Sequence, residues 1–310
     1  MLYPTHKRYG ILFGFLTFPV GVAIGLVPTL TETMRASDLT LVVMCCYMAM
    51  RGALFGARFP DIDTPNSRPA KKHPIIRKIF AFFHLKHRGK FSHDLATQTA
   101  FWGIILFFVS HISDRWLNSL VGASNLWLSL TALTALCFVW FVSLDIVDVL
   151  KWGADLAKSQ KHWAILNRNR FKIGACIGGV LTVLLMISGV FNVSDALLFQ
   201  TSLSSALKSA TILISAFKVY ILFTWAGVYS HLIADMVTKS GISIFGIPIA
   251  PAKVVLQVRK IPVIGVLLVP TDFRTGSKWE DMHRYGATIL CIPAFIWAFY
   301  VVTGFQVVGT

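Results

Sequence analysis

Three short polar segments of the sequence contain residue types that bind divalent metal ions. They are Phe59–Ser67 (FPDIDTPNS), His87–His93 (HRGKFSH) and His231–Asp235 (HLIAD). Histidine nitrogens mixed with carboxylate oxygens suit Zn²⁺, Mn²⁺ or Fe²⁺, whereas Ca²⁺ prefers an all-oxygen set. The chemistry indicated is metal-assisted hydrolysis, in which ions acidify a bound water and neutralise the charge of a phosphoester.

The spacing within two of these segments supports a shared site. His231 and Asp235 are four residues apart, so on a helix their side chains lie on one face. Asp61 and Asp63 are bracketed by prolines, which favour extended backbone. In an extended chain, side chains two residues apart point the same way. The sequence therefore predicts that both carboxylates face one ion site.

The third segment supplies histidines and a cation. Ser92 is expected to be the N-cap of the following helix, which would place His93 in its first turn. Arg88 is expected to bind a phosphate oxygen through its forked guanidinium donors. Asp63 is predicted to be a ligand or the general base, and Glu280 a further ligand or a residue that orients a histidine. The predicted metal ligands, a set for two or three ions, are His6, Asp61, Asp63, His87, His93, His231 and Asp235.

Each of these features has a plainer interpretation. The PDID sequence is also typical of an Asx-type turn, and a helix-end His and Asp form an ion pair without metal. Solvated loop positions are the expectation for the other histidines, which are His73, His84, His111, His162 and His283. Arg51 is expected to snorkel to the membrane surface. Lys218 is expected at the outer interface, and Asp145 at the start of an inner loop. The metal hypothesis rests on the conjunction of the segments.

The composition predicts a polytopic membrane protein with an all-α fold. The chain has 310 residues, of which 55% are hydrophobic and 14% charged, against about 25% charged in soluble domains. The net charge of +15 is attributed to loop residues that set topology and meet anionic lipid, so no nucleic-acid partner is expected. All five cysteines lie in apolar runs without CxxC spacing and are interpreted as core residues.

Seven apolar segments are predicted to cross the membrane. By residue number they are about 10–30, 39–56, 95–113, 124–147, 173–193, 210–238 and 284–305. With the N-terminus inside, 24 of the 29 Lys and Arg residues fall in inside segments and 3 in outside segments. Because cytoplasmic loops are enriched in these residues, the sequence predicts one membrane domain, 1–310, with a cytoplasmic N-terminus and an outside C-terminus.

The predicted topology places every candidate group at the cytoplasmic end of a span. His6 precedes the first span, Phe59–Ser67 follows the second, and His87–His93 precedes the third. His231–Asp235 ends the sixth span, and Thr275–Asp281, which contains Glu280, precedes the seventh. We therefore expect these groups to assemble at one face of the bundle.

Taken in order, the motifs resemble those of the YdjM-like membrane-bound, metal-dependent hydrolases of bacteria, which include LexA-regulated inner-membrane proteins. The family pattern is an early His, then PD-x-D, HRG-x-TH, H-x-x-x-D and a later Gly-Ser/Asn-x-x-Glu. The resemblance covers about residues 1–113 and 219–305. Ser92-His93 replaces the usual Thr-His. The segment 115–208, with two predicted spans, is longer than in the family and is interpreted as an insert.

The resemblance implies a hydrolase of the bacterial inner membrane that uses metal, with zinc as the first expectation. Together with the motifs it predicts cleavage of a phosphoester, such as a phospholipid or a lipid-linked phosphate reached at the membrane face. Two alternatives stay open. One is a transporter or metal-ion carrier, which would place ionisable residues near the middle of the bilayer. The other is a catalytically silent stress or prophage protein with a structural metal. The sequence does not predict an oligomeric state.

Overall fold

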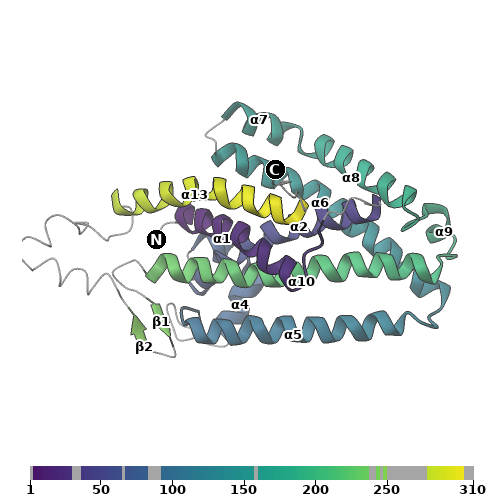
Figure 1. Ribbon diagram of the computed structural model, residues 1–310, viewed down its shortest axis with the longest axis horizontal. Helices are drawn as coiled ribbons and strands as arrows, with labels where there is room; N and C mark the ends of the chain where they lie inside the picture. Colours follow the sequence, from purple (N-terminus) through teal and green to yellow (C-terminus); the bar gives the residue numbers. More distant parts are fainter. Residues whose placement is uncertain are drawn as a thin grey trace, which may run out of the picture.

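The computed structural model describes residues 3–29, 36–64, 67–82, 92–156, 160–236, 242–244, 247–249 and 278–303. As predicted, the fold is an all-helical bundle, with one short hairpin (Figure 1). Its long helices are α1 (Tyr3–Ala23), α2 (Ala36–Gly56), α5 (Leu95–Ser119), α6 (Asn125–Leu156), α8 (Arg170–Ile187), α10 (Leu203–Met236) and α13 (Lys278–Thr303). The short elements are the 3-10 helix η1 (Pro60–Asp63), α3 (Arg68–Lys72), α4 (Pro74–Phe82), α7 (Gln160–Arg168), α9 (Val193–Leu197), and the antiparallel strands β1 (Ile242–Ile244) and β2 (Ile247–Ile249).

Six of the described helices are long and apolar enough to cross a membrane, as expected of a multi-pass membrane protein. They are α2, α5, α6, α8, α10 and α13. The predicted first span, 10–30, is not confirmed as a seventh. Its helix α1 begins near the N-terminus and ends at Ala23, because the chain turns through Gly25, whose φ is +70°. The amides of Leu26 and Val27 then bond back to the carbonyl of Gly21 at 2.9 and 3.0 Å.

The helix α6 continues beyond its predicted end. Asp145 was expected to begin an inner loop, and this prediction is wrong, because the helix runs on to Leu156. Asp145 is held inside the bundle by Arg51, at 2.9 Å, and by Arg170, at 3.5 Å. The hydroxyl of Tyr47 also donates to this carboxylate at 2.7 Å. These partners offset the cost of removing the Asp145 carboxylate from water. The helix can therefore continue past this residue.

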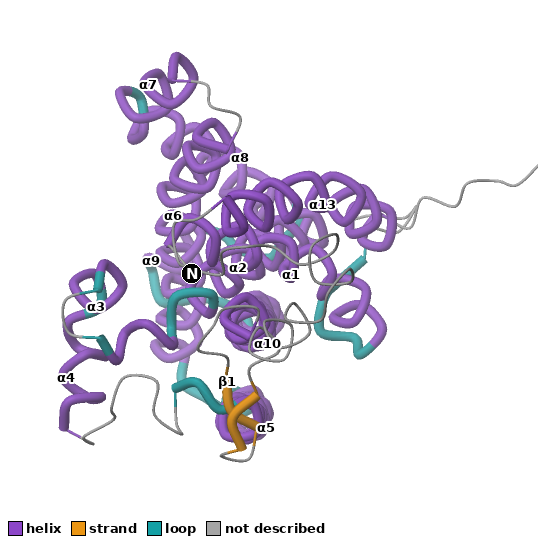
Figure 2. Tube along the Cα trace, turned by 90° about the vertical axis from the view of Figure 1, so that its left-hand side faces the viewer, coloured by secondary structure: helices purple, strands orange, loops and turns teal. Residues whose placement is uncertain are grey.

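The helix α10 lies at the centre of the bundle and contacts α1, α2, α5 and α6 (Figure 2). Its closest approach is to α2, where three glycines, Gly52, Gly56 and Gly227, leave room for the facing backbone. A Cβ atom on Gly56 would lie 1.9 Å from the Thr224 carbonyl oxygen, and one on Gly227 would lie 2.2 Å from that of Ala53. Small residues of this kind allow helices in membranes to pack backbone to backbone. The contact brings the end of α2 against the last turns of α10.

The helices α6 and α8, which lie in the predicted insert, pack into the same bundle. A buried apolar cluster joins Met44 of α2 to Val139 of α6, Leu181 of α8 and Ile212 of α10. The segment 115–208 therefore shares its core with helices on both sides of it in the sequence.

Candidate metal centre

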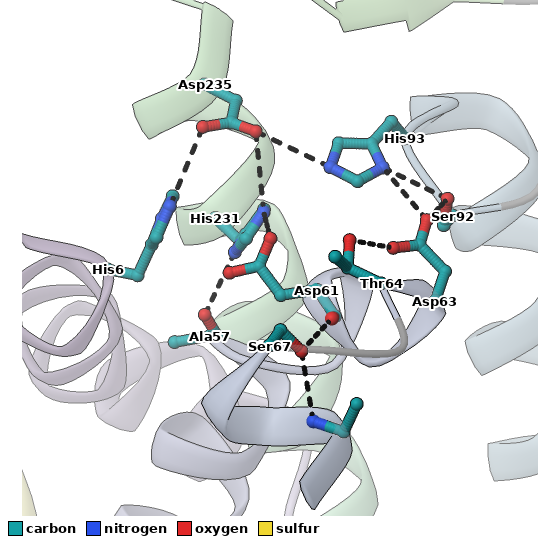
Figure 3. Close-up of polar contacts among 11 residues, drawn as sticks. His6, Ala57, Asp61, Asp63, Thr64, Ser67, Ser92, His93, His231 and Asp235 are labelled. Atoms are coloured by element: carbon teal, nitrogen blue, oxygen red, sulfur yellow. Dashed lines mark hydrogen bonds and ion pairs between the residues drawn. The ribbon is translucent and has the colours of Figure 1, made fainter. Parts of the chain in front are cut away.

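The candidate ligands meet at one end of the bundle, the left-hand end in Figure 1. His6 lies in the first turns of α1, and Asp61 lies in η1, directly after α2. His93 comes two residues before α5 begins. His231 and Asp235 lie in the last two turns of α10. Figure 3 shows their side chains pointing toward one another, so the predicted assembly of these five residues is what the structure contains.

The carboxylate of Asp235 lies between three imidazole rings. Its Oδ1 atom is 3.6 Å from Nε2 of His6. Its Oδ2 atom is 3.5 Å from Nε2 of His93 and 3.5 Å from Nε2 of His231. All four residues are at most 3% exposed. The rings of His6 and His231 also stack, with centroids 3.9 Å apart. Three ring nitrogens therefore converge on one buried carboxylate.

Asp61 adds a second carboxylate. Its Oδ1 atom is 3.7 Å from Nε2 of His231, and 26% of its side chain is exposed. Among the described ligands it is the one that solvent reaches. Two groups of three ligand atoms lie within 4.8 Å of one another: His6, Asp61 and His231 form one, and His93, His231 and Asp235 form the other.

The orientation of the His231 ring is set by a backbone group. Its Nδ1 atom is 3.0 Å from the carbonyl oxygen of Ala57. A carbonyl only accepts hydrogen bonds, so Nδ1 carries the proton and donates it. In the neutral ring Nε2 then presents a lone pair to Asp61 and Asp235, and within the described chain this buried atom makes no hydrogen bond. An imidazole held through its outer N–H is the usual arrangement of a metal-binding histidine.

His93 is oriented by a side-chain relay. The Ser92 hydroxyl lies 2.5 Å from Oδ2 of Asp63 and 3.0 Å from Nδ1 of His93. A carboxylate only accepts, so the hydroxyl donates to Asp63 and accepts the N–H of His93. Nε2 of His93 is then the atom with the lone pair toward Asp235. Burial lowers the pKa of His93, which favours the neutral ring that binds metal.

The distances between the ligand atoms favour a shared ion over hydrogen bonds. The N···O separations of 3.5–3.7 Å exceed the roughly 2.7–3.2 Å of N–H···O hydrogen bonds. Two ligands of one tetrahedral Zn²⁺, each at about 2.0–2.1 Å, lie about 3.3 Å apart. An imidazole nitrogen lone pair and a carboxylate oxygen that face each other repel unless a cation lies between them. The donor set and its spacing therefore fit a divalent metal.

Asp63 does not belong to either group of three. Its carboxylate contacts Ser92, and Oδ2 lies 3.8 Å from the outer nitrogen of His93. The expected extended backbone of Asp61 and Asp63 is wrong, because residues 60–63 form a 3-10 helix. With three residues per turn, side chains two residues apart point in directions about 120° apart around the helix axis. The Asp61 carboxylate thus faces Nε2 of His231. The Asp63 carboxylate instead faces Nδ1 of His93, the ring nitrogen that is directed away from Asp235.

The expected N-cap of α5 is also wrong. Asp94 caps the helix, and its carboxylate accepts the amide hydrogen of Thr97 at 2.9 Å. This places His93 before the helix and leaves the Ser92 hydroxyl available to His93 and Asp63.

Of the other predicted site residues, His87 and Arg88 lie outside the described residues. Glu280 lies in the first turn of α13, but its side chain is outside the described part.

Two groups of the centre were not found from the sequence. The Ala57 carbonyl is a backbone atom, and no residue type marks it. Its neighbours Gly52, Ala53 and Gly56 form a small-residue pattern that could have indicated a close helix contact at this position. Ser92 was recognised, but in a capping role.

Comparisons of the chain with protein-family models, curated proteins and solved structures found no match.

Proposed function

We propose that this chain is a membrane-embedded, metal-dependent hydrolase of a phosphoester, acting at the cytoplasmic face of a bacterial inner membrane. The observation that carries the proposal is the convergence of three imidazole nitrogens and two carboxylates at separations of 3.5–3.7 Å. The excess of Lys and Arg on one side of the predicted spans supports the cytoplasmic location. The resemblance of the ordered motifs to the YdjM-like hydrolases supports the reaction class.

The residues of the centre divide into ligands and positioning residues. His6, Asp61, His93, His231 and Asp235 would hold the metal, with zinc preferred and Mn²⁺ or Fe²⁺ also suited to the donors. A bound divalent ion supplies Lewis-acid polarisation of a phosphoryl oxygen and acidifies a water molecule. Asp63 would position His93 rather than act as a general base, because its carboxylate reaches the Nδ1 side of that ring through Ser92. Arg88 remains the proposed phosphate-binding residue, and Glu280 the proposed additional acid.

Asp235 is the proposed bridge of a two-ion centre. One nitrogen lone pair serves one ion, so His231 can belong to only one of the two groups that share it. The two oxygens of Asp235 face different histidines, Oδ1 toward His6 and Oδ2 toward His93. A carboxylate arranged in this way would be shared by the ions of a two-metal centre, which would supply an acidified water and neutralise the charge of a phosphoester. The partly exposed side chain of Asp61 marks the side from which a lipid phosphate would enter.

The first experiment measures metal content by elemental mass spectrometry on detergent-purified protein. The wild type is compared with the double variant His231→Ala/Asp235→Ala. The matched control is His111→Ala/Asp114→Ala, which removes the same residue types from exposed positions on α5. We expect two or more zinc or manganese ions per chain in the wild type and in the control, and loss of the metal in the first variant. The same preparations are then assayed on phospholipids and lipid-linked phosphates.

Each outcome separates the proposal from its rivals. A wild-type protein that is folded, free of metal and not loaded by added metal would refute the centre, and a proton on His231 would then hold the two carboxylates. Bound metal with no hydrolysis of any phosphoester would refute the enzyme and favour a structural metal. Metal-dependent hydrolysis that is lost in the first variant and kept in the control would support it.

A further inference from the structure

The short helix α4 exposes large apolar side chains, although it does not cross the membrane. Ile75, Ile79 and Phe82 are 73%, 48% and 76% exposed. Because residues three or four positions apart share one face of a helix, these side chains form a single stripe, called the α4 stripe below. The helix has nine residues, whereas a span needs about 20. An exposed apolar stripe on such a helix marks an interaction surface.

A neighbouring face of α4 fixes the helix to the bundle. The buried ring of Phe80 packs edge-on against Phe59, with centroids 5.4 Å apart. The ring of Phe59 packs in turn against Trp102 of α5, at 5.1 Å, and Ile76 joins the same apolar cluster. Figure 2 shows α3 and α4 on the side of the bundle away from α1 and α13. Since Phe80 and Ile76 dock the helix, the α4 stripe is left to contact another surface.

These ring contacts place α4 at the level where the lipid-facing surface of the bundle begins. Phe59 follows Gly56, the last residue of the candidate span in α2, by three positions. On α5 the first exposed large hydrophobic side chain is that of Ile104, two residues after Trp102, and side chains of this kind continue to Ile112. In a spanning helix such side chains face acyl chains. The helix α4 therefore lies near the boundary of acyl chains and headgroups, where amphipathic helices bind.

The charge around the α4 stripe indicates the chemistry of its partner. Between Thr64 and His93 the sequence has eight Lys or Arg residues and no Asp or Glu. Lys71, Arg77 and Lys78 make no ion pair within the part of the chain that the structure describes. Anionic headgroups complement this charge, whereas a second copy of the chain would bring like charges together. Apolar residues flanked by basic ones are typical of helices that lie in the membrane interface.

We propose that α4 is an interfacial anchor that binds the anionic lipid surface of the membrane holding the bundle. The α4 stripe enters the lipid beside the spanning helices. The side chains of Lys71, Arg77 and Lys78 contact anionic headgroups. This anchor does not depend on the proposed hydrolysis.

The anchor is connected to the candidate metal centre through α3 and η1. Ser67 is the N-cap of α3, where its hydroxyl accepts the amide hydrogen of Ala70 at 3.1 Å. The same hydroxyl donates to the backbone carbonyl of Asp61 at 2.7 Å. The segment that binds the lipid surface thus also holds the backbone of a candidate ligand.

Photo-crosslinking of the full chain in lipid nanodiscs tests the anchor. The photoreactive residue p-benzoylphenylalanine, which reacts with C–H bonds that it touches, replaces Ile79, Ile75 or Ala81 in separate variants. Ala81 is the matched control, because it is also exposed on α4 but lies about 160° from Ile79 around the helix axis. The nanodiscs contain an equimolar mixture of phosphatidylglycerol and phosphatidylcholine, and mass spectrometry identifies the attached molecule.

We expect lipid attached at positions 79 and 75 and little at position 81. The attached lipid should be enriched in phosphatidylglycerol at least about twofold, because basic residues near the surface attract anionic lipid. Adding Arg77→Gln and Lys78→Gln to the variant at position 79 should return the ratio toward that of the bilayer. Attachment at positions 79 and 75 to peptide, of the same chain or of a second copy, would overturn the proposal. Equal attachment of lipid at positions 79 and 81, or no enrichment of the anionic lipid, would also refute it.

Discussion

The hydroxyl of Ser92 offers the sharpest test of how the metal centre is built. Ser92→Ala removes the group that accepts the Nδ1 proton of His93 and donates to Asp63, and it removes no ligand. Loss of a partner that orients a metal-binding histidine costs 10–100-fold in metal affinity. We therefore expect the zinc dissociation constant to rise about 10–100-fold, equivalent to about 1.4–2.8 kcal/mol. This agrees with the roughly 1.5–3 kcal/mol of a hydrogen bond to a charged group.

The assay is a competition titration of zinc between the purified protein and a chromophoric chelator. Ser230→Ala is the matched control, because Ser230 is also buried beside a histidine ligand. Its hydroxyl donates only within its own helix, to the Gly227 carbonyl at 2.6 Å, and we expect a change of less than about threefold, below 0.7 kcal/mol. If the two variants had the same zinc affinity, the relay would have no role in orienting His93.

Three further predictions follow from the same structure. Asp63→Ala should weaken zinc binding more than Asp63→Asn, because the amide oxygen still accepts from Ser92, and equal losses in the competition titration would contradict this. Gly227→Ala should lower stability by about 1–3 kcal/mol in thermal unfolding, because the added Cβ would meet the Ala53 carbonyl. Gly179→Ala, with nothing within 4 Å of its added Cβ, should be nearly neutral. Chelation should lower the unfolding temperature of the wild type, because it removes about 2.7 kcal/mol from the free energy of unfolding if free metal was present at 100 times its dissociation constant. An equal effect of chelator on His231→Ala/Asp235→Ala would show that the metal is bound elsewhere.

Hydrophobicity alone predicted the all-helical class and six of the seven spans, whereas the predicted span 10–30 is not confirmed among the described helices. Apolar runs of sufficient length become helices in any membrane arrangement, because the backbone must satisfy its own hydrogen bonds in lipid. The ends of these helices were less predictable. The helix α6 runs past Asp145 because partners from α2 and α8 neutralise that carboxylate, and such partners are distant in the sequence.

The sequence by itself determined the all-helical class and the residue types of the candidate centre. It also determined the pairing of His231 with Asp235, because residues four positions apart on a helix lie on the same face. Tertiary structure alone decided that Asp235 lies among three histidines, and that Asp61 and Asp63 face different rings. It also decided that the Ala57 carbonyl orients His231. These outcomes depend on the close approach of α2 and α10, which are far apart in the chain, and on the 3-10 geometry of η1, whose local hydrogen bonds replace the extended backbone that its prolines favour.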